Sequence, residues 1–235
     1  MTKLVLFDID GTLVNAAGAG RIAMSSSIET LYGVSNAADD VDFIGRSDLY
    51  ILRRALTNAG IPPERLDEAL TTTRAEYFRI LPGILKECNQ GRALEGVVEV
   101  LEGLRYSVQI GLATGNFRES AFMKLEHYGL EGYFSTGGFG DDAEERAEIV
   151  YEAIRRCKEL AGLQQDITGM YLVGDSPRDV MGGKAVGIKT VAVASGWTSL
   201  EELAIYEPTV LLPDLSCVSA FFKAVGVAPG QADNT

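Results

Sequence analysis

The sequence predicts an α/β fold, a Rossmann-like parallel sheet that carries an inserted helical domain. Three observations support this class. Short, continuously apolar segments recur along the chain, as expected for strands that are covered on both faces. Stretches with helical periodicity separate most of these segments, which is the pattern of a parallel sheet with crossover helices. One long interval near the N-terminus breaks the alternation, because it contains helix-like stretches and few strand signals.

Four apolar segments are the candidate strands. They are Lys3–Asp8, Val108–Thr114, Gly169–Asp175 and Ile188–Ala194. The clearest helix of the core is Ala143–Gly162, where the apolar residues follow a three-four spacing and Gly162 is a suitable C-cap. Another amphipathic helix is predicted shortly after Arg92.

The interval that breaks the alternation is predicted to be a separate helical domain. Its helix-like stretches are Ile22–Tyr32, Leu49–Ala59 and Glu64–Leu81, separated by glycines and by a pair of prolines. We therefore predict two domains: residues 1–14 and 92–235 form the α/β core, and residues 15–91 form a helical cap.

Composition excludes several classes of protein. Among 235 residues, 33 are acidic and 21 are basic, a net charge of −12 that disfavours binding to nucleic acid or to an anionic membrane surface. No apolar run is long enough for a transmembrane helix, and no signal peptide is predicted. The three cysteines are far apart and suit neither a disulfide framework nor a metal site, which favours the cytoplasm. A single histidine, His127, excludes a histidine-rich metal site.

Acidic and polar residues follow the predicted strands at the points where they end. Asp8 and Asp10 follow the first strand, Thr114-Gly115-Asn116 the second, and Asp175 and Asp179 the third. The carboxyl ends of parallel strands meet at one edge of a sheet, where functional groups of such folds gather. Carboxylates that converge there repel one another, and a hard divalent cation such as Mg²⁺ relieves the repulsion. Neighbouring backbone N–H groups and polar side chains suit phosphate oxygens.

These motifs resemble those of haloacid dehalogenase (HAD) superfamily phosphatases. The resemblance covers nearly the whole chain and depends on Phe7–Val14, Ala113–Asn116 and Val173–Asp179. The predicted cap resembles the small helical cap of that family. Within it, Phe43–Asp48 is similar to a segment of phosphoglycolate-phosphatase-like members.

The resemblance implies a role for each matching residue. Asp8 would be the nucleophile that forms an aspartyl-phosphate, and Asp10 the general acid and base. Mg²⁺ would be held by Asp8, the backbone carbonyl of Asp10 and Asp175, with Asp179 as a ligand or as support. Thr114, with Gly115 and Asn116 beside it, would bind the phosphoryl oxygens.

One motif departs from the family pattern. The usual cation before the last of these motifs is a Lys next to a Pro, and no Lys-Pro pair occurs here. Arg146 is the predicted replacement; the alternative is that it is an exposed residue paired with Asp141 or Asp142. Arg46, in the cap, is predicted to bind a substrate carboxylate or hydroxyl groups.

The sequence thus predicts a Mg²⁺-dependent phosphatase of a small phosphorylated metabolite, phosphoglycolate-like or a sugar phosphate. A phosphosugar mutase of the same superfamily stays open as an alternative. A different class, a non-enzymatic module that binds a ligand or accepts a phosphoryl group, also stays open. A dehalogenase is disfavoured because it lacks a second acid at the position of Asp10. The sequence makes no prediction of the oligomeric state.

Overall fold

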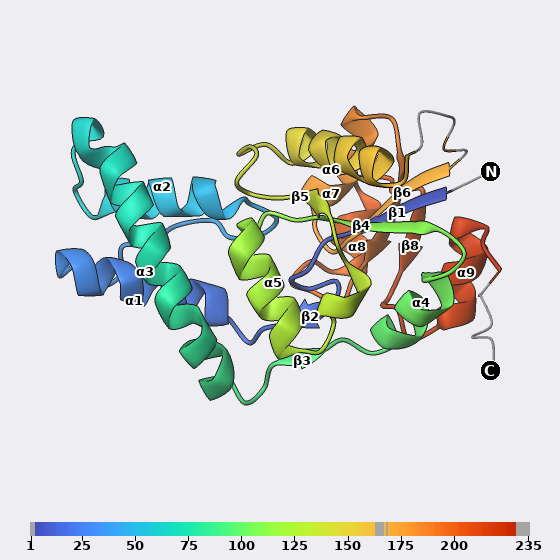
Figure 1. Ribbon diagram of the computed structural model, residues 1–235, viewed down its shortest axis with the longest axis horizontal. Helices are drawn as coiled ribbons and strands as arrows, with labels where there is room; N and C mark the ends of the chain where they lie inside the picture. Colours follow the sequence, from blue (N-terminus) through green and yellow to red (C-terminus); the bar gives the residue numbers. More distant parts are fainter. Residues whose placement is uncertain (1–2, 163–166, 168, 229–235) are drawn as a thin grey trace.

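A computed structural model describes residues 3–162, 167 and 169–228 of the chain. Its centre is a six-stranded parallel sheet with the strand order β5-β4-β1-β6-β7-β8 (Figure 1). The strands are β1 (Lys3–Phe7), β4 (Gln109–Ala113), β5 (Gly137–Gly138), β6 (Gly169–Gly174), β7 (Lys189–Val193) and β8 (Val210–Leu212). This arrangement confirms the predicted fold class.

The central strand β1 shows why its sequence is apolar throughout. Val5 and Phe7 belong to a hydrophobic cluster on one face of the sheet, and Leu4 and Leu6 to a cluster on the other face. Helices cover both faces and complete three layers (Figure 1). The core helices are α4 (Val97–Leu104), α5 (Arg118–His127), α6 (Arg146–Leu160), α7 (Pro177–Ala185), α8 (Leu200–Ala204) and α9 (Val218–Val225).

Three helices lie apart from the sheet and surround a hydrophobic cluster of their own. They are α1 (Ala19–Tyr32), α2 (Asp48–Asn58) and α3 (Leu66–Glu87) (Figure 1). The chain enters this helical part through β2 (Val14–Asn15) and leaves it through β3 (Arg92–Ala93), and these two short strands pair in antiparallel fashion. We propose residues 15–91 as the cap and use that name below.

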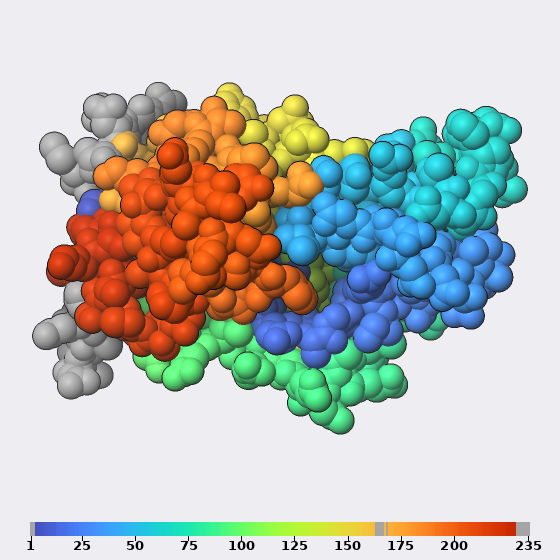
Figure 2. All heavy atoms as spheres, turned by 180° about the vertical axis from the view of Figure 1, so that it is seen from behind, coloured from blue at the N-terminus to red at the C-terminus, as the bar shows by residue number. Residues whose placement is uncertain are grey.

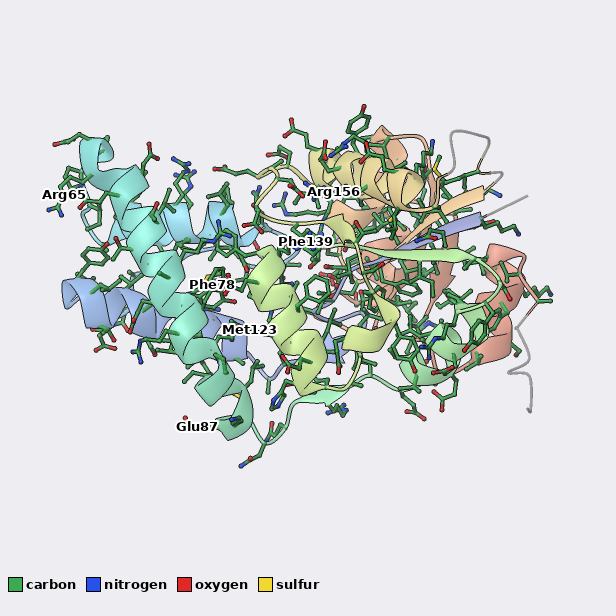
Figure 3. The ribbon with its side chains drawn as sticks, in the orientation of Figure 1. Arg65, Phe78, Glu87, Met123, Phe139 and Arg156 are labelled. Carbon is green, nitrogen blue, oxygen red and sulfur yellow. The ribbon has the colours of Figure 1, made fainter. Side chains whose placement is uncertain are left out.

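The cap is not isolated from the core. Helix α3 packs against α5, and Figure 3 shows Phe78 and Met123 between these two helices. Phe117, which precedes α5, is buried in the same cluster and stacks edge-on against Phe78. Helix α5 therefore belongs to the core by sequence position and to the cap's hydrophobic cluster by one of its faces.

Two details differ from the sequence-based expectation. Helix α3 was expected to end at Leu81, before a proline, but it continues through Pro82 to Glu87. Proline removes one backbone hydrogen bond, yet Tyr77, Leu81 and Leu85 form one buried stripe that favours continuation. Strands β5 and β8 were not predicted, since both are very short and lie at the two edges of the sheet. No helix within the described residues is long and apolar enough to cross a membrane.

The contact between β5 and α6 allows a test of the packing. A Cβ atom on Gly138 would collide with the carbonyl oxygen of Ile149 and lie 2.9 Å from the backbone nitrogen of Ala153. Because backbone atoms cannot move aside cheaply, Gly138→Ala should lower the free energy of unfolding by about 1–3 kcal/mol. Urea denaturation measures this. Gly132→Ala is the control, since nothing lies within 4 Å of the added atom there; equal effects of the two changes would contradict the packing.

Candidate active site

Parallel pairing brings the polar residues at the strand ends to one edge of the sheet. Phe7 is in register with Leu112 of β4 and with Val173 of β6. Asp8 follows Phe7 directly, and Thr114 and Asp175 come two residues after its register partners, so all three lie at this edge. The predicted convergence of these residues is thus found in the structure, although their roles remain predictions.

Three buried carboxylates form the centre of this edge. Asp8, Asp175 and Asp179 each offer an oxygen atom, and the three atoms lie within 4.8 Å of one another. Asp179 is held by the first turn of α7, because its Oδ2 accepts hydrogen bonds from the backbone N–H and the hydroxyl of Ser176, at 3.1 and 2.6 Å. This reciprocal capping box orients Asp179 from a rigid helix end.

One buried guanidinium faces the carboxylates. Arg146 is the first residue of α6, and its Nη2 donates a hydrogen bond to Asp8 Oδ2 at 3.1 Å. Its Nε lies 3.2 Å from Asp179 Oδ1, and its Nη1 donates to the carbonyl oxygen of Ala113 at 3.1 Å. The alternative pairing with Asp141 or Asp142 is not formed. Those residues pair instead with Arg74 and Arg156.

Burial and crowding change the acidity of the carboxyl groups. Burial raises the pKa of Asp8 to about 6, with Asp179 adding to the rise and Arg146 and the Thr114 hydroxyl opposing it. Burial and the neighbouring Asp179 and Asp8 raise the pKa of Asp175 well above its ordinary value. One arginine thus does not balance three carboxylates. A hard divalent cation fits this all-oxygen donor set and would supply the missing positive charge.

Asp10 lies on the cavity side of the cluster and is held by two donors. Its Oδ2 accepts hydrogen bonds from Asn116 Nδ2 at 2.8 Å and from Lys124 Nζ at 2.6 Å. Lys124 also donates to Asn116 Oδ1 at 2.6 Å, so the three side chains form a closed ring. Asn116 Nδ2 additionally contacts Thr114 Oγ1 at 2.8 Å. The sequence analysis did not predict Lys124 as a site residue.

The cap reaches the core at the loop after β4. The backbone N–H of Asp48, the first residue of α2, donates to the carbonyl oxygen of Gly115 at 2.6 Å. Its carboxylate accepts from the N–H of Phe117 at 2.9 Å and from the hydroxyl of Ser120 at 3.1 Å. A Cβ on Gly115 would collide with the carbonyl oxygen of Arg46, so only glycine permits this close approach. The predicted phosphate-binding loop thus contacts the cap directly.

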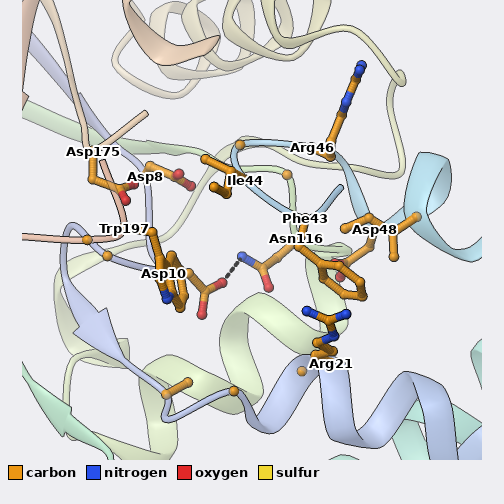
Figure 4. A pocket seen from close by; sticks show the side chains of 18 of the residues that line it. Asp8, Asp10, Arg21, Phe43, Ile44, Arg46, Asp48, Asn116, Asp175 and Trp197 are labelled. Atoms are coloured by element: carbon orange, nitrogen blue, oxygen red, sulfur yellow. Dashed lines mark hydrogen bonds between the residues drawn. The ribbon is translucent and has the colours of Figure 1, made fainter. Parts of the chain in front are cut away.

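A cavity of about 640 Å³ lies between the cap and the core, with Asp8 and Asp10 in its wall. Figure 2 shows the hollow where the blue residues of the cap meet the orange residues of the core. Cap residues Phe43 and Ile44 face Trp197 of the core across the cavity (Figure 4). Arg21, not predicted as a site residue, also lines it and lies over the Phe43 ring at 4.8 Å.

The guanidinium of Arg46 lies apart from the other residues that the sequence predicts to bind the substrate. Its guanidinium lies over the ring of Tyr50 at 4.2 Å, and its Nε is 3.5 Å from Asp42. Figure 4 shows this side chain pointing away from Asp10 and Asn116, although Arg46 does contribute to the cavity wall. Its role in substrate binding stays a prediction.

Comparisons with known proteins agree with this arrangement. A family model described as haloacid dehalogenase-like hydrolase matches residues 5–193. The chain belongs to this family. It is 33% identical to a pyrophosphatase, PpaX, from Anoxybacillus flavithermus over 217 residues, 90% of this chain and 93% of the relative. It is 24% identical to a phosphoglycolate phosphatase from Agrobacterium fabrum, covering 99% of this chain and 97% of the relative.

Solved structures of this family share the fold. The crystal structure of a predicted phosphoglycolate phosphatase from Haemophilus somnus matches with a TM-score of 0.69 at 20% identity, covering 94% of this chain and 97% of the other. The family, the fold class and the enzyme class, a phosphatase of the haloacid dehalogenase-like hydrolases, are confirmed. Members of the family typically use a divalent metal, in agreement with the three clustered carboxylates.

The buried carboxyl of Asp48 should make stability depend on pH. Burial raises its pKa from 3.8 to about 6 in the folded protein, while Lys124 opposes the rise. Folding therefore favours the protonated form, so this contribution is complete below pH 3.8 and is lost as the pH rises through about 6. The loss amounts to about 3 kcal/mol at most. Relative to Asp48→Asn, the wild type should lose stability between pH 4 and pH 7.

Urea unfolding at several pH values measures this difference. Asp40→Asn is the matched control, because Asp40 is an exposed aspartate of the same cap. Its difference from the wild type should stay constant with pH. A constant difference for Asp48→Asn as well would show that Asp48 is not held in a desolvated site.

Proposed function

We propose that the protein is a Mg²⁺-dependent phosphatase that hydrolyses a small phosphorylated molecule through an aspartyl-phosphate on Asp8. The observation that carries this proposal is the pairing of Asp8 with Arg146 beside two further buried carboxylates, with Asp10 nearby on the same cavity. A nucleophile, a fixed positive charge and a second carboxyl group are what a two-step phosphoryl transfer requires.

The chain's own residues account for the two steps. In the first, Asp8 attacks phosphorus, the bond from phosphorus to the leaving oxygen breaks, and Asp10 gives its proton to that oxygen. In the second, Asp10 takes a proton from a water molecule that attacks phosphorus, and the Asp8 carboxylate and inorganic phosphate are released. Arg146 orients Asp8 throughout, since its guanidinium is fixed by the backbone of Ala113.

Asp8, Asp175 and the backbone carbonyl of Asp10 are proposed to hold Mg²⁺, with Asp179 supporting the set. The ion would neutralise charge on the phosphoryl group and orient it for attack. Thr114, Gly115 and Asn116 are proposed to donate hydrogen bonds to the phosphoryl oxygens. A phosphoryl group at Asp8 would lie beside this loop, because β1 and β4 are neighbours in register.

The size of the cavity supports a small substrate. Its volume of about 640 Å³ suits a compact ester or anhydride, and the cap covers it on one side. Relatives named pyrophosphatase and phosphoglycolate phosphatase make pyrophosphate and phosphoglycolate the first compounds to test, with sugar phosphates beside them. A cytoplasmic location is part of the same proposal, and it agrees with the free thiols of Cys88, Cys157 and Cys217.

Phosphate release tests the proposal. Purified protein is given pyrophosphate, phosphoglycolate, a hexose phosphate and p-nitrophenyl phosphate, with and without Mg²⁺. We expect release only with Mg²⁺, and Asp8→Asn should lower kcat by about 10⁴-fold or more, because it removes the nucleophile. Asp40→Asn should keep full activity. Release that persists in Asp8→Asn would contradict the mechanism. Little phosphate release, together with bisphosphate-dependent isomerisation of the hexose phosphate, would favour the mutase.

Metal binding is tested without any substrate. Mg²⁺ at 100 times its dissociation constant should stabilise the wild type by about 2.7 kcal/mol, seen as a higher melting temperature in differential scanning fluorimetry. Asp175→Asn should abolish the Mg²⁺-dependent rise. It should not destabilise the metal-free protein, because it removes a carboxyl that the buried cluster repels. An unchanged Mg²⁺ effect in Asp175→Asn would place the metal elsewhere.

A further inference from the structure

Lys124 is a buried cation with no part in the mechanism described so far. It lies in the middle of the inward face of α5, which it shares with the buried residues Ser120, Ala121 and Leu125. Only 4% of its surface is exposed. A lysine in such a place costs desolvation energy, and an apolar residue of similar size commonly stabilises a protein as well or better. Stability alone is therefore a weak explanation for this side chain.

Lys124 contacts Asp10 both directly and through Asn116. Its Nζ contacts Asp10 Oδ2 at 2.6 Å and Asn116 Oδ1 at 2.6 Å, and Asn116 in turn donates to the same Asp10 oxygen at 2.8 Å. Two donors thus fix Oδ2, whereas among the described residues no donor contacts Oδ1. The carboxyl group is oriented through one oxygen, and the other is left for the reacting atoms.

Asp10 needs such support because the protein encloses its side chain only in part. It follows β1 on a loop, and 27% of its side chain is exposed to the cavity. A general acid acts only when its oxygen is within hydrogen-bond reach of the leaving atom. Helix α5 is a rigid support for that purpose, since it packs between the core and α3 of the cap.

We propose that Lys124 is a positioning residue, which holds Asp10 in the orientation that protonates the leaving group. The inference rests on the proposed function and deepens it, because it adds a residue through which the general acid works. Lys124 acts through Asp10 and Asn116, and it makes no contact with the metal-binding carboxylates Asp8, Asp175 and Asp179 among its hydrogen bonds and ion pairs within the described residues.

The test compares two kinds of leaving group. An alkoxide is too basic to leave without a proton, so an alkyl phosphate needs a well-placed Asp10. The p-nitrophenolate anion is stable and leaves without one. The value of kcat/KM reports the steps up to the departure of the leaving group. A variant that misplaces Asp10 should therefore harm the alkyl substrate selectively.

Lys124→Met keeps the length and packing of the side chain and removes its charge and donors. We expect kcat/KM to fall by about 100-fold for the alkyl phosphate, and by about threefold or less for p-nitrophenyl phosphate. In an Asp10→Asn background, Lys124→Met should change neither value further, because its effect runs through Asp10. Lys184→Met, which removes a half-exposed lysine on α7, is the matched control and should be neutral.

Other results would overturn the inference. Equal falls for both substrates would indicate a structural role, and a rise in KM at constant kcat would indicate a substrate ligand. Absence of Asp8-dependent phosphate release would overturn the proposed function itself, and the comparison of the wild type with Asp8→Asn shows this before Lys124 is changed. Thermal melting checks that each variant is folded. Lys124→Gln, which is shorter than lysine and uncharged, provides the same comparison should the Met variant not fold.

Discussion

Mutual repulsion among Asp8, Asp175 and Asp179 is the constraint on which the rest of the site depends. Three carboxylates in a buried space are unfavourable unless positive charge and hydrogen bonds meet them. Arg146, in the first turn of α6, supplies positive charge, and the capping box of α7 supplies hydrogen bonds to Asp179. Both supports come from helix ends at the edge of the sheet. The parallel strand order is what brings these ends together.

The position of Arg146 follows from the same constraint. A cation at a helix N-terminus is opposed by the helix dipole, so the site is unfavourable unless anions lie close by. Here two carboxylates lie within 3.2 Å of its guanidinium, and the backbone carbonyl of Ala113 accepts a hydrogen bond from its Nη1. Arginine suits this geometry better than lysine, because its planar group reaches several oxygens at once.

The strand ends and the family were predictable, because Asp8, Asp10 and Asp175 directly follow apolar runs in a recognisable order. Lys124 was not found, because a lysine in a helix is ordinarily exposed. The available signal was its place between the apolar residues of α5, and its meaning needed the tertiary packing of α3 on α5. Strand β5 could not be predicted from the sequence for a similar reason. Two glycines have no strand propensity, and only pairing with β4 makes them a strand.

The antiparallel pairing of β2 with β3 determines how the cap is connected to the core. Val14 lies opposite Ala93, so the chain departs from the core and returns to it at adjacent points. By its connections to the core, the segment 15–91 is a single insertion, although α3 also packs on α5. Lengthening a loop adds little closure entropy. The whole segment can therefore be exchanged as one module, and with it one wall of the cavity, provided that the new segment also covers the face of α5 on which α3 packs.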